Sequence, residues 1–363
     1  MKKEGIGLIV PRFIPPILSY PLQDVIEKID GEYIELGEVI NAIPPSKAKL
    51  SINNMFHHIL IIGSTGSGKT FTASKIINEL NKKRARIKSI VIDWHGEYRD
   101  LIKDPCYLSP YENPIPVLDK SDIYGSVDLL SDTLELTNSQ LYVLEKIIKE
   151  YKDRIVDLNS LHHHIENYID DSGWMRESRL ALLRRLSPLM RSNYIEIFNV
   201  KTDRTIVKIM DTLNCNTLLF DVSLIKDPIV RKIYVSVLLK KILSLAFSRK
   251  IKYKVLLVIE EAHNLINKEK PVKILSTMLA ETRKFGVGLI IVSQSPSRLL
   301  EDVMVNTNTK IIHSIKSSID LDIVNKVLYL PFEYQKMIPY LEVGEAIFYT
   351  RGLKKPIIIK IEV

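Results

Sequence analysis

Residues Gly63-Ser64-Thr65-Gly66-Ser67-Gly68-Lys69-Thr70 follow directly on the apolar run Ile59-Leu60-Ile61-Ile62. The three glycines allow the backbone to wrap around a polyphosphate with its N–H groups pointing inward. Lys69 can reach the β- and γ-phosphates, and the Thr70 hydroxyl can hold Mg²⁺. A helical composition follows from Phe71, so a helix N-terminus adds partial positive charge. The stretch therefore predicts a nucleoside-triphosphate site rather than a chance Gly/Ser-rich turn. The predicted nucleotide-binding residues are Gly63, Ser64, Thr65, Gly66, Ser67, Gly68, Lys69, Thr70 and Phe71.

The composition is that of a folded protein with a substantial core. The chain has 363 residues, of which 46% are hydrophobic and 26% charged, enough for one large or two ordinary domains. No apolar run approaches the ~20 residues that a membrane span needs, so we expect no membrane partner. The net charge of +8 fits a polyanionic partner. A lysine-rich surface kept for solubility or heat tolerance explains that charge equally well.

The chain contains two cysteines, Cys106 and Cys215. Their spacing matches neither a metal site nor a disulfide framework. We therefore expect no disulfide, and a reducing, intracellular setting in the cytoplasm.

Strand patterns alternate with helical ones through much of the chain. Apolar runs end at Asp93, at the pair Glu260-Glu261 and just before Gln294. Such alternation predicts an α/β fold with a mostly parallel sheet covered on both faces. Ligands of these sheets lie beyond the carboxyl ends of the strands. The phosphate loop and these polar residues all lie there.

The chain is expected to divide into an N-terminal segment and one ATPase domain. Residues 1–50 hold short apolar runs between Pro and Gly signals, which predict a few strands and loops. Residues 51–363 form the ATPase domain, with a helical insertion at about 101–215, where apolar residues recur at helical spacing. Thr137 and Gln140 form a plausible capping box within it.

The run Val255–Glu261 has the form of a Walker B strand. Glu260 would orient the Mg²⁺ shell through water, and Glu261 would orient and polarise the attacking water. The first acid is Glu rather than the commoner Asp, which places the metal contact slightly further out. The alternative is a strand whose polar end residues are only solvated.

Two further positions carry candidate roles. Gln294 can sense the γ-phosphate or hold the attacking water, although Gln-Ser-Pro also fits an ordinary strand exit. Arg283 and Lys284 precede that strand. A basic residue there can reach the nucleotide of a neighbouring subunit, as an arginine finger does; by itself the pair also reads as a solvated cationic turn.

Beside the phosphate loop stand four further motifs in order: Asp93-x-His95-Gly96-Glu97-Tyr98, Ile259-Glu260-Glu261-Ala262-His263-Asn264, Arg283-Lys284-Phe285-Gly286-Val287-Gly288 and Ser293-Gln294-x-Pro296-Ser297. In order and spacing, this set resembles the HerA branch of the HerA/FtsK superfamily of RecA-like P-loop ATPases. The similarity runs from about residue 51 to the C-terminus and includes the helical insertion.

The resemblance implies a hexameric, ATP-driven motor that moves along double-stranded DNA, with ATP and Mg²⁺ bound at the phosphate loop. It implies metal and water contacts from Glu260 and Glu261, phosphate sensing by Gln294 and action in trans by Arg283. The cluster at 93–98 would lie near the nucleotide. Asp93, Glu97 and Lys284 are therefore expected to have supporting roles.

Two departures from the family pattern stand out. About fifty residues precede the ATPase strand, where HerA proteins usually carry a larger β-barrel, so we expect a reduced barrel. This weakens the expectation of a NurA-type nuclease partner. Ser295 also stands where the family often has Arg.

Two other functions stay open. One is a viral or plasmid DNA-packaging or conjugation motor on the same fold. The other is a nucleotide-gated scaffold in which hydrolysis is slow.

Overall fold

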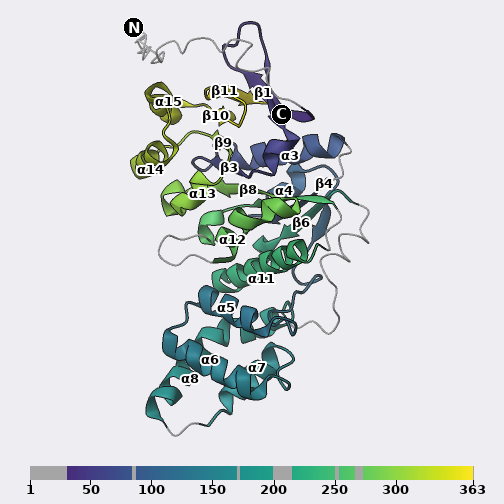
Figure 1. The fold of residues 1–363 in the computed structure, drawn as a ribbon, viewed down its shortest axis with the longest axis vertical. Helices are drawn as coiled ribbons and strands as arrows, with labels where there is room; N and C mark the ends of the chain where they lie inside the picture. The colour runs from purple at the N-terminus through teal and green to yellow at the C-terminus, as the bar shows by residue number, and fades with distance from the viewer. Residues whose placement is uncertain are drawn as a thin grey trace, which may run out of the picture.

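The computed structural model describes residues 31–83, 87–169, 172–198, 215–249, 253–265 and 273–362. Most of the predicted N-terminal segment, residues 1–30, lies outside these ranges. The described strands form one 11-stranded sheet in the order β2-β1-β11-β10-β9-β3-β8-β7-β4-β6-β5. Figure 1 shows the sheet and its covering helices in one part of an elongated molecule, and helices α5 to α8 as a lobe at the other end.

The strands match most of the predicted apolar runs. They are β1 (Tyr33–Val39), β2 (Lys47–Ser51), β3 (Ile59–Ile62), β4 (Ile87–Asp93), β5 (Cys106–Leu108), β6 (Thr217–Asp221), β7 (Lys254–Ile259), β8 (Val287–Ser293), β9 (Thr309–Ile312), β10 (Glu345–Tyr349) and β11 (Ile357–Ile361).

The α-helices fall into a set beside the sheet and a set in the insertion. They are α2 (Ile52–Met55), α3 (Lys69–Lys82), α4 (Tyr98–Leu101), α5 (Ile123–Leu134), α6 (Asn138–Tyr151), α7 (Leu158–Glu166), α8 (Gly173–Leu186), α9 (Ser192–Ile195), α11 (Pro228–Phe247), α12 (Lys273–Glu281), α13 (Glu301–Val305), α14 (Ser318–Leu328) and α15 (Phe332–Met337). No helix within the described ranges is long and apolar enough to cross a membrane.

The centre of the sheet is parallel, as predicted for an α/β fold. Strands β9, β3, β8, β7, β4, β6 and β5 pair in parallel. The late strands β10 and β11 instead pair antiparallel, as do β1 and β2 at the edge. The link between β10 and β11 is too short for the crossover that parallel strands need, so the chain returns as a hairpin.

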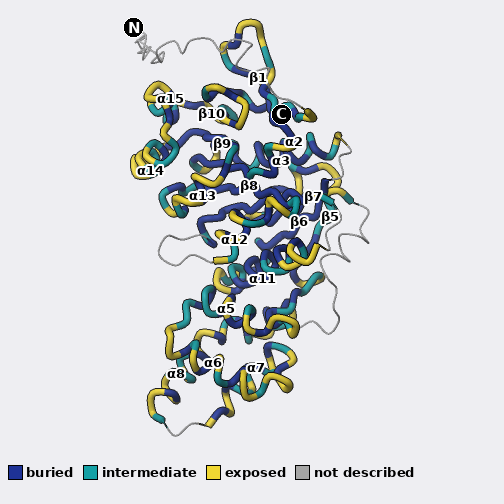
Figure 2. Tube along the Cα trace, viewed as in Figure 1, coloured by how far each residue is buried: buried dark blue, intermediate teal, exposed yellow. Residues whose placement is uncertain are grey.

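Alternate residues of the central strands enter two hydrophobic cores. Leu60 and Ile62 of β3 face the core that α11 covers, whereas Ile59 and Ile61 face the core that α3 covers. Figure 2 shows the central part of the sheet coloured dark blue, as buried. Burial on both faces explains why these strands read as continuous apolar runs rather than alternating ones.

The helical insertion is built from α5 to α9. The capping box that the sequence predicts begins α6: the Thr137 Oγ1 accepts the Gln140 N–H at 3.3 Å, and the Gln140 Oε1 accepts the Thr137 N–H at 3.0 Å. At the base of the insertion α5 packs on α11, and Asp122 pairs with Lys240 at 2.9 Å. The insertion thus shares one core with the sheet.

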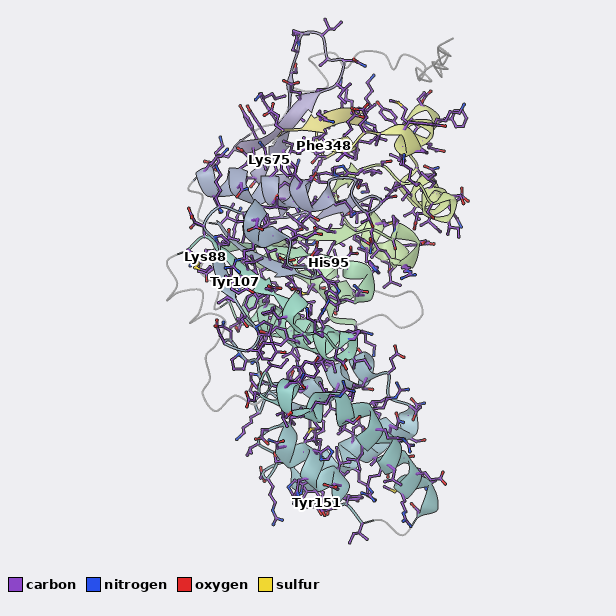
Figure 3. All side chains as sticks on the ribbon, turned by 180° about the vertical axis from the view of Figure 1, so that it is seen from behind. Lys75, Lys88, His95, Tyr107, Tyr151 and Phe348 are labelled. Carbon is purple, nitrogen blue, oxygen red and sulfur yellow. A yellow bond between two sulfur atoms is a disulfide. The ribbon has the colours of Figure 1, made fainter. Side chains whose placement is uncertain are left out.

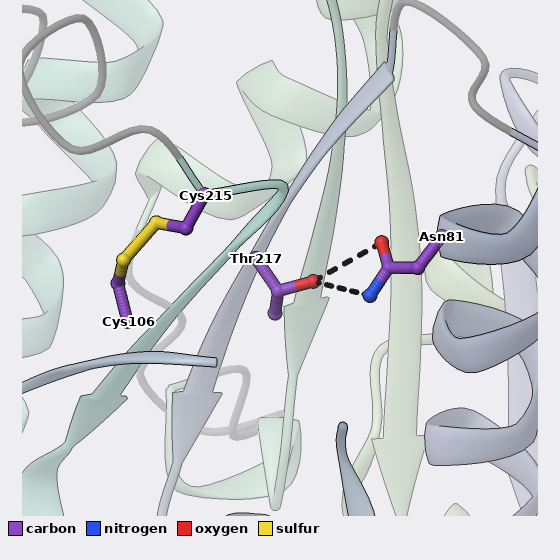
Figure 4. Close-up of a disulfide and its surroundings, with 4 residues drawn as sticks. All are labelled: Asn81, Cys106, Cys215 and Thr217. Atoms are coloured by element: carbon purple, nitrogen blue, oxygen red, sulfur yellow. Dashed lines mark hydrogen bonds between the residues drawn. A yellow bond between two sulfur atoms is a disulfide. The ribbon is translucent and has the colours of Figure 1, made fainter. Parts of the chain in front are cut away.

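The two cysteines are joined, so the expectation of no disulfide is wrong. Cys106 lies in β5, next to Leu218 of β6, and Cys215 lies just before β6 (Figure 4). The parallel pairing of these strands brings together two residues that are 109 positions apart. The sequence pattern could not reveal this register. The inference of a reducing compartment from these cysteines falls with it.

Candidate active site

Five neighbouring parallel strands deliver polar residues to one edge of the sheet. In the order β9-β3-β8-β7-β4, their carboxyl ends carry His313, the phosphate loop, Gln294, the pair Glu260-Glu261, and Asp93. Four of these five were predicted from the sequence to share a site. The fifth, His313, was not predicted to belong to the site.

The phosphate loop has the backbone form that an anion cradle requires. Gly63, Gly66 and Gly68 have φ values of 156°, 74° and 109°. A Cβ on Gly63 would lie 2.6 Å from the Cβ of His313 and 2.7 Å from the Ser67 Oγ. Glycine is therefore required at position 63 both by the backbone angle and by the lack of space.

Two side chains of the loop suit a phosphate ligand. The Lys69 Nζ donates to the Ser64 carbonyl at 2.9 Å, within the loop. Burial lowers the pKa of Lys69, although the nearby carboxylates oppose this effect. The Ser67 Oγ is buried and has no hydrogen-bond partner. Because buried polar atoms are rarely left unpaired, these groups fit a bound polyphosphate. Phe71 is half-buried at the start of α3.

Glu260 connects the phosphate loop to the loop after β4. Its Oε1 lies 3.5 Å from the Thr70 hydroxyl, and its Oε2 accepts the Trp94 N–H at 2.8 Å. Burial and the neighbouring Asp93 carboxylate raise the pKa of Glu260. A buried carboxylate beside a threonine hydroxyl and a phosphate cradle is the donor set that Mg²⁺ takes together with substrate phosphates. The residues present therefore fit this cation.

Asp93 fixes the backbone of the loop that follows it. Its Oδ1 accepts the Gly96 N–H at 2.7 Å and the Glu97 N–H at 3.2 Å, and its Oδ2 accepts the Tyr98 N–H at 2.9 Å. Asp93 thus holds the backbone of the loop after β4, which fits the supporting role predicted for it. Glu97 is exposed at its end.

Glu261 lies between two histidines. Its backbone has a left-handed φ of 49°, which is uncommon for a residue with a side chain. Its Oε2 lies 2.9 Å from the His263 Nδ1, and its Oε1 lies 3.6 Å from the His95 Nε2. Burial opposes ionisation, but His263, Lys69 and His95 outweigh it and lower the pKa of Glu261. The carboxylate is therefore kept ionised, as a water-orienting group needs.

Gln294 contacts the phosphate loop directly. Its Oε1 accepts a hydrogen bond from the Thr65 hydroxyl at 2.6 Å. Thr65 is exposed at the tip of the loop. This contact links the end of β8 to the segment that would surround the phosphates.

Arg283 and Lys284 do not join the other candidates. They lie in the turn η4 (Thr282–Phe285), at the amino end of β8. The seven residues of β8 separate them from Gln294 by roughly 20 Å, at about 3.3 Å per residue. Both are exposed, and Lys284 pairs with Glu281 at 3.1 Å. Neither side chain can reach the phosphate loop of its own chain.

Three histidines of the site had no role in the sequence prediction. His95 and His263 stand within quoted motifs, but only the folded chain brings both to Glu261. His313 lies against the phosphate loop: its Nε2 is 2.9 Å from the Thr72 hydroxyl, and its Nδ1 is 2.9 Å from the Glu345 carbonyl. The available signal was a histidine near the end of the strand predicted at Lys310–Ser314.

A strand, glycine-rich loop and helix beside an acid pair on a parallel sheet define a P-loop nucleotide-binding protein. The family described as Helicase HerA, central domain, matches residues 34–242. The chain belongs to this family, as its motifs predicted.

Relatives match nearly the whole chain. It is 27% identical to the DNA double-strand break repair helicase HerA of Sulfolobus acidocaldarius, over 96% of this chain and 74% of that protein. It is 25% identical to a probable helicase of Methanocaldococcus jannaschii, over 100% of this chain and 74% of that protein.

Solved structures share the fold. VirB4 of Thermoanaerobacter pseudethanolicus matches with a TM-score of 0.73 at 17% identity, over 92% of this chain and 98% of that one. The plasmid coupling protein TrwB, in complex with ADP and Mg²⁺, matches with a TM-score of 0.62 at 14% identity, over 93% and 96%. These structures confirm the predicted RecA-like P-loop architecture.

Proposed function

We propose that this chain is an ATPase that drives movement along double-stranded DNA, HerA-like, in DNA end processing or repair. The observation that carries the proposal is the meeting of the phosphate loop, the Glu260-Glu261 pair and Gln294 at neighbouring strand ends. The name of the Sulfolobus relative and the net charge of +8 support DNA as the substrate.

The reaction is attack of water on the γ-phosphoryl group of ATP, which releases ADP and phosphate. The backbone N–H groups of the loop and Lys69 bind the phosphates. Glu261 orients the attacking water and accepts hydrogen bonding from it. Thr70 and Glu260 would hold Mg²⁺, which when bound neutralises phosphate charge. Gln294, directly after β8, detects the γ-phosphate, and its hydrogen bond with Thr65 links the phosphate loop to that strand.

The exposed Arg283 belongs, in this proposal, to the site of a neighbouring copy. It lies roughly 20 Å from Gln294 of its own chain, at about 3.3 Å per residue of β8. A ring, most simply a homo-hexamer, would place the amino end of one sheet beside the carboxyl end of the next. An arginine that reaches across such an interface stabilises charge in the transition state.

Steady-state ATP hydrolysis, measured with and without duplex DNA, tests the function. We expect DNA to stimulate turnover, and added salt to weaken DNA binding because phosphate contacts release counterions. Lys69→Ala should abolish hydrolysis and nucleotide binding while the thermal unfolding transition persists. Glu261→Gln should bind ATP without turnover.

Turnover that duplex DNA leaves unchanged, together with no DNA binding at low salt, would contradict the proposal. Full hydrolysis by the Lys69→Ala variant would show that the phosphate loop is not the ATP site. Purification of the natural protein with a nuclease would support a role in end processing, whereas a capsid or secretion component would point to a packaging or conjugation motor.

A further inference from the structure

His95 contacts both acids of the candidate site. Its backbone N–H lies 3.3 Å from the Glu260 Oε2, and its imidazole Nε2 lies 3.6 Å from the Glu261 Oε1. Figure 3 places His95 in the sheet-containing part of the molecule, far from Tyr151 in the insertion. A single residue therefore connects the acid assigned to the metal with the acid assigned to water.

Glu261 depends on side chains for its orientation. Its carboxylate is buried, with a side-chain exposure of 8%, and it forms ion-pair contacts with the imidazoles of His263 and His95. These two rings approach different oxygens of the carboxylate. Removal of one ring would leave the carboxylate held from one side.

The loop that carries His95 is fixed from two directions. At the end of β4, the Asp93 carboxylate accepts hydrogen bonds from several backbone N–H groups of this loop. From α11, Arg231 donates to the Trp94 carbonyl at 3.2 Å and lies over the Trp94 ring, 5.3 Å from its centroid. A preorganised loop of this kind can hold a side chain within the narrow range that catalysis needs.

The half-exposed imidazole leaves room for adjustment. The His95 side chain is 48% exposed, while the Glu261 carboxylate that it faces is almost fully buried. Hydrogen bonds of catalytic groups often tighten when substrate binds. A shift of a few tenths of an ångström would turn the 3.6 Å contact into a hydrogen bond.

We propose that His95 is a positioning residue for ATP hydrolysis. Its imidazole holds the Glu261 carboxylate toward the attacking water, and its backbone N–H fixes the position of this carboxylate relative to that of Glu260. The proposal rests on the proposed ATPase function. His95 does not touch the phosphates in this role. Its loss should therefore lower the rate of the chemical step and leave nucleotide binding nearly intact.

The test compares His95→Ala and His95→Gln with the wild-type protein. Alanine should lower kcat by roughly 10- to 100-fold, the usual cost of losing a partner that orients a catalytic group. KM for ATP, and the affinity for a fluorescent ATP analogue, should stay within about twofold. Glutamine should restore a large part of kcat, because its amide N–H₂ can donate to Glu261. A role in folding alone would not produce this separation of kcat from KM.

His162→Ala is the matched control. His162 also faces a glutamate, with its Nδ1 4.0 Å from the Glu166 Oε2, but it lies on α7 in the insertion. Its loss should leave kcat and KM unchanged. Thermal unfolding of all three variants checks that the fold persists.

Two results would overturn the inference. One overturns the role of His95 alone, and the other also overturns the proposed ATPase function. If the wild-type protein hydrolyses ATP and Glu261→Gln does not, an unchanged kcat in His95→Ala overturns the role of His95 alone. If the wild-type protein does not hydrolyse ATP under any condition, the proposed function fails, and this inference with it.

Discussion

At the scale of single residues, His313 supports the phosphate loop from the neighbouring strand. The carbonyl of Glu345 can only accept a hydrogen bond, so the His313 Nδ1 carries the proton and the Nε2 is left to accept from Thr72. Burial lowers the pKa of His313 to about 4. The ring is therefore neutral at physiological pH.

This burial makes the stability of the protein depend on pH. The folded-state pKa of His313 lies below the unfolded value of 6.5, so the unfolded chain takes up the proton first. The stabilisation is complete above pH ~6.5 and is lost as pH falls toward ~4. At about pH 5 we expect the loss to be about 2 kcal/mol from this residue.

Urea unfolding at about pH 7 and pH 5 measures this effect. Between about pH 7 and pH 5, the free energy of unfolding should decrease in both proteins. The decrease should be about 2 kcal/mol smaller for His313→Asn than for the wild-type protein. His163→Asn, at an exposed position on α7, should keep the wild-type pH dependence. Equal slopes for His313→Asn and wild type would contradict the account.

At the scale of elements, the sequence predicts those features that depend on local pattern. The apolar runs Lys254–Ile259 and Glu345–Tyr349 predict strands, and β7 and β10 have these bounds. Residues buried on both faces leave an uninterrupted signal. The segment 55–62, which leads into the phosphate loop, predicts a strand over its whole length, but α2 ends at Met55 and β3 begins at Ile59. There, an apolar run contains the end of a helix as well as a strand.

Features that depend on strand pairing were not predictable. The antiparallel direction of β10 and β11 follows from a short link and not from their composition. The bond between Cys106 and Cys215 follows from the neighbouring positions of β5 and β6. The sequence predicts a strand over Lys310–Ser314, which would place His313 in its interior, but β9 ends at Ile312 and leaves His313 beside the phosphate loop.

The disulfide closes the part of the chain that contains the insertion, since its cysteines are 109 positions apart. Joining such distant residues restricts the unfolded chain, so reduction should lower the free energy of unfolding by about 2–5 kcal/mol. Thermal and urea unfolding with and without a thiol reductant measure this. The Cys106→Ser/Cys215→Ser double variant should match the reduced protein and be insensitive to reductant. Unfolding that reductant leaves unchanged in the wild-type protein would contradict the prediction.

At the scale of the whole molecule, the position of Arg283 predicts that each active site is shared between two copies of the chain in a ring. Rings made only of Arg283→Ala or only of Glu261→Gln should be inactive. The first lacks the residue that a neighbour contributes to each site, and the second lacks the acid of the chain that binds the nucleotide. Mixed rings should recover part of the activity, because some sites combine an intact Glu261 with an intact Arg283 from the neighbour. Mixtures of Lys69→Ala with Glu261→Gln should recover none, because every site then keeps one defect. Absence of rescue in the first mixture would contradict a role for Arg283 in trans.

A series of direct contacts joins the candidate site to the helical insertion. The loop after β4 contacts the acids at one side and Arg231 of α11 at the other. Helix α11 in turn packs against α5 at the base of the insertion. Contacts thus continue from the acids of the site through the loop after β4 and α11 to the lobe.

Displacement of a third strand from duplex DNA tests most directly whether ATP hydrolysis drives movement. A bound third strand leaves the duplex when a motor travels along it, without any need to separate the duplex strands. We expect the wild-type protein to displace the third strand in the presence of ATP and Mg²⁺, and Glu261→Gln to bind the duplex without displacement. ATP hydrolysis that duplex DNA stimulates but that never displaces the third strand would contradict the central claim.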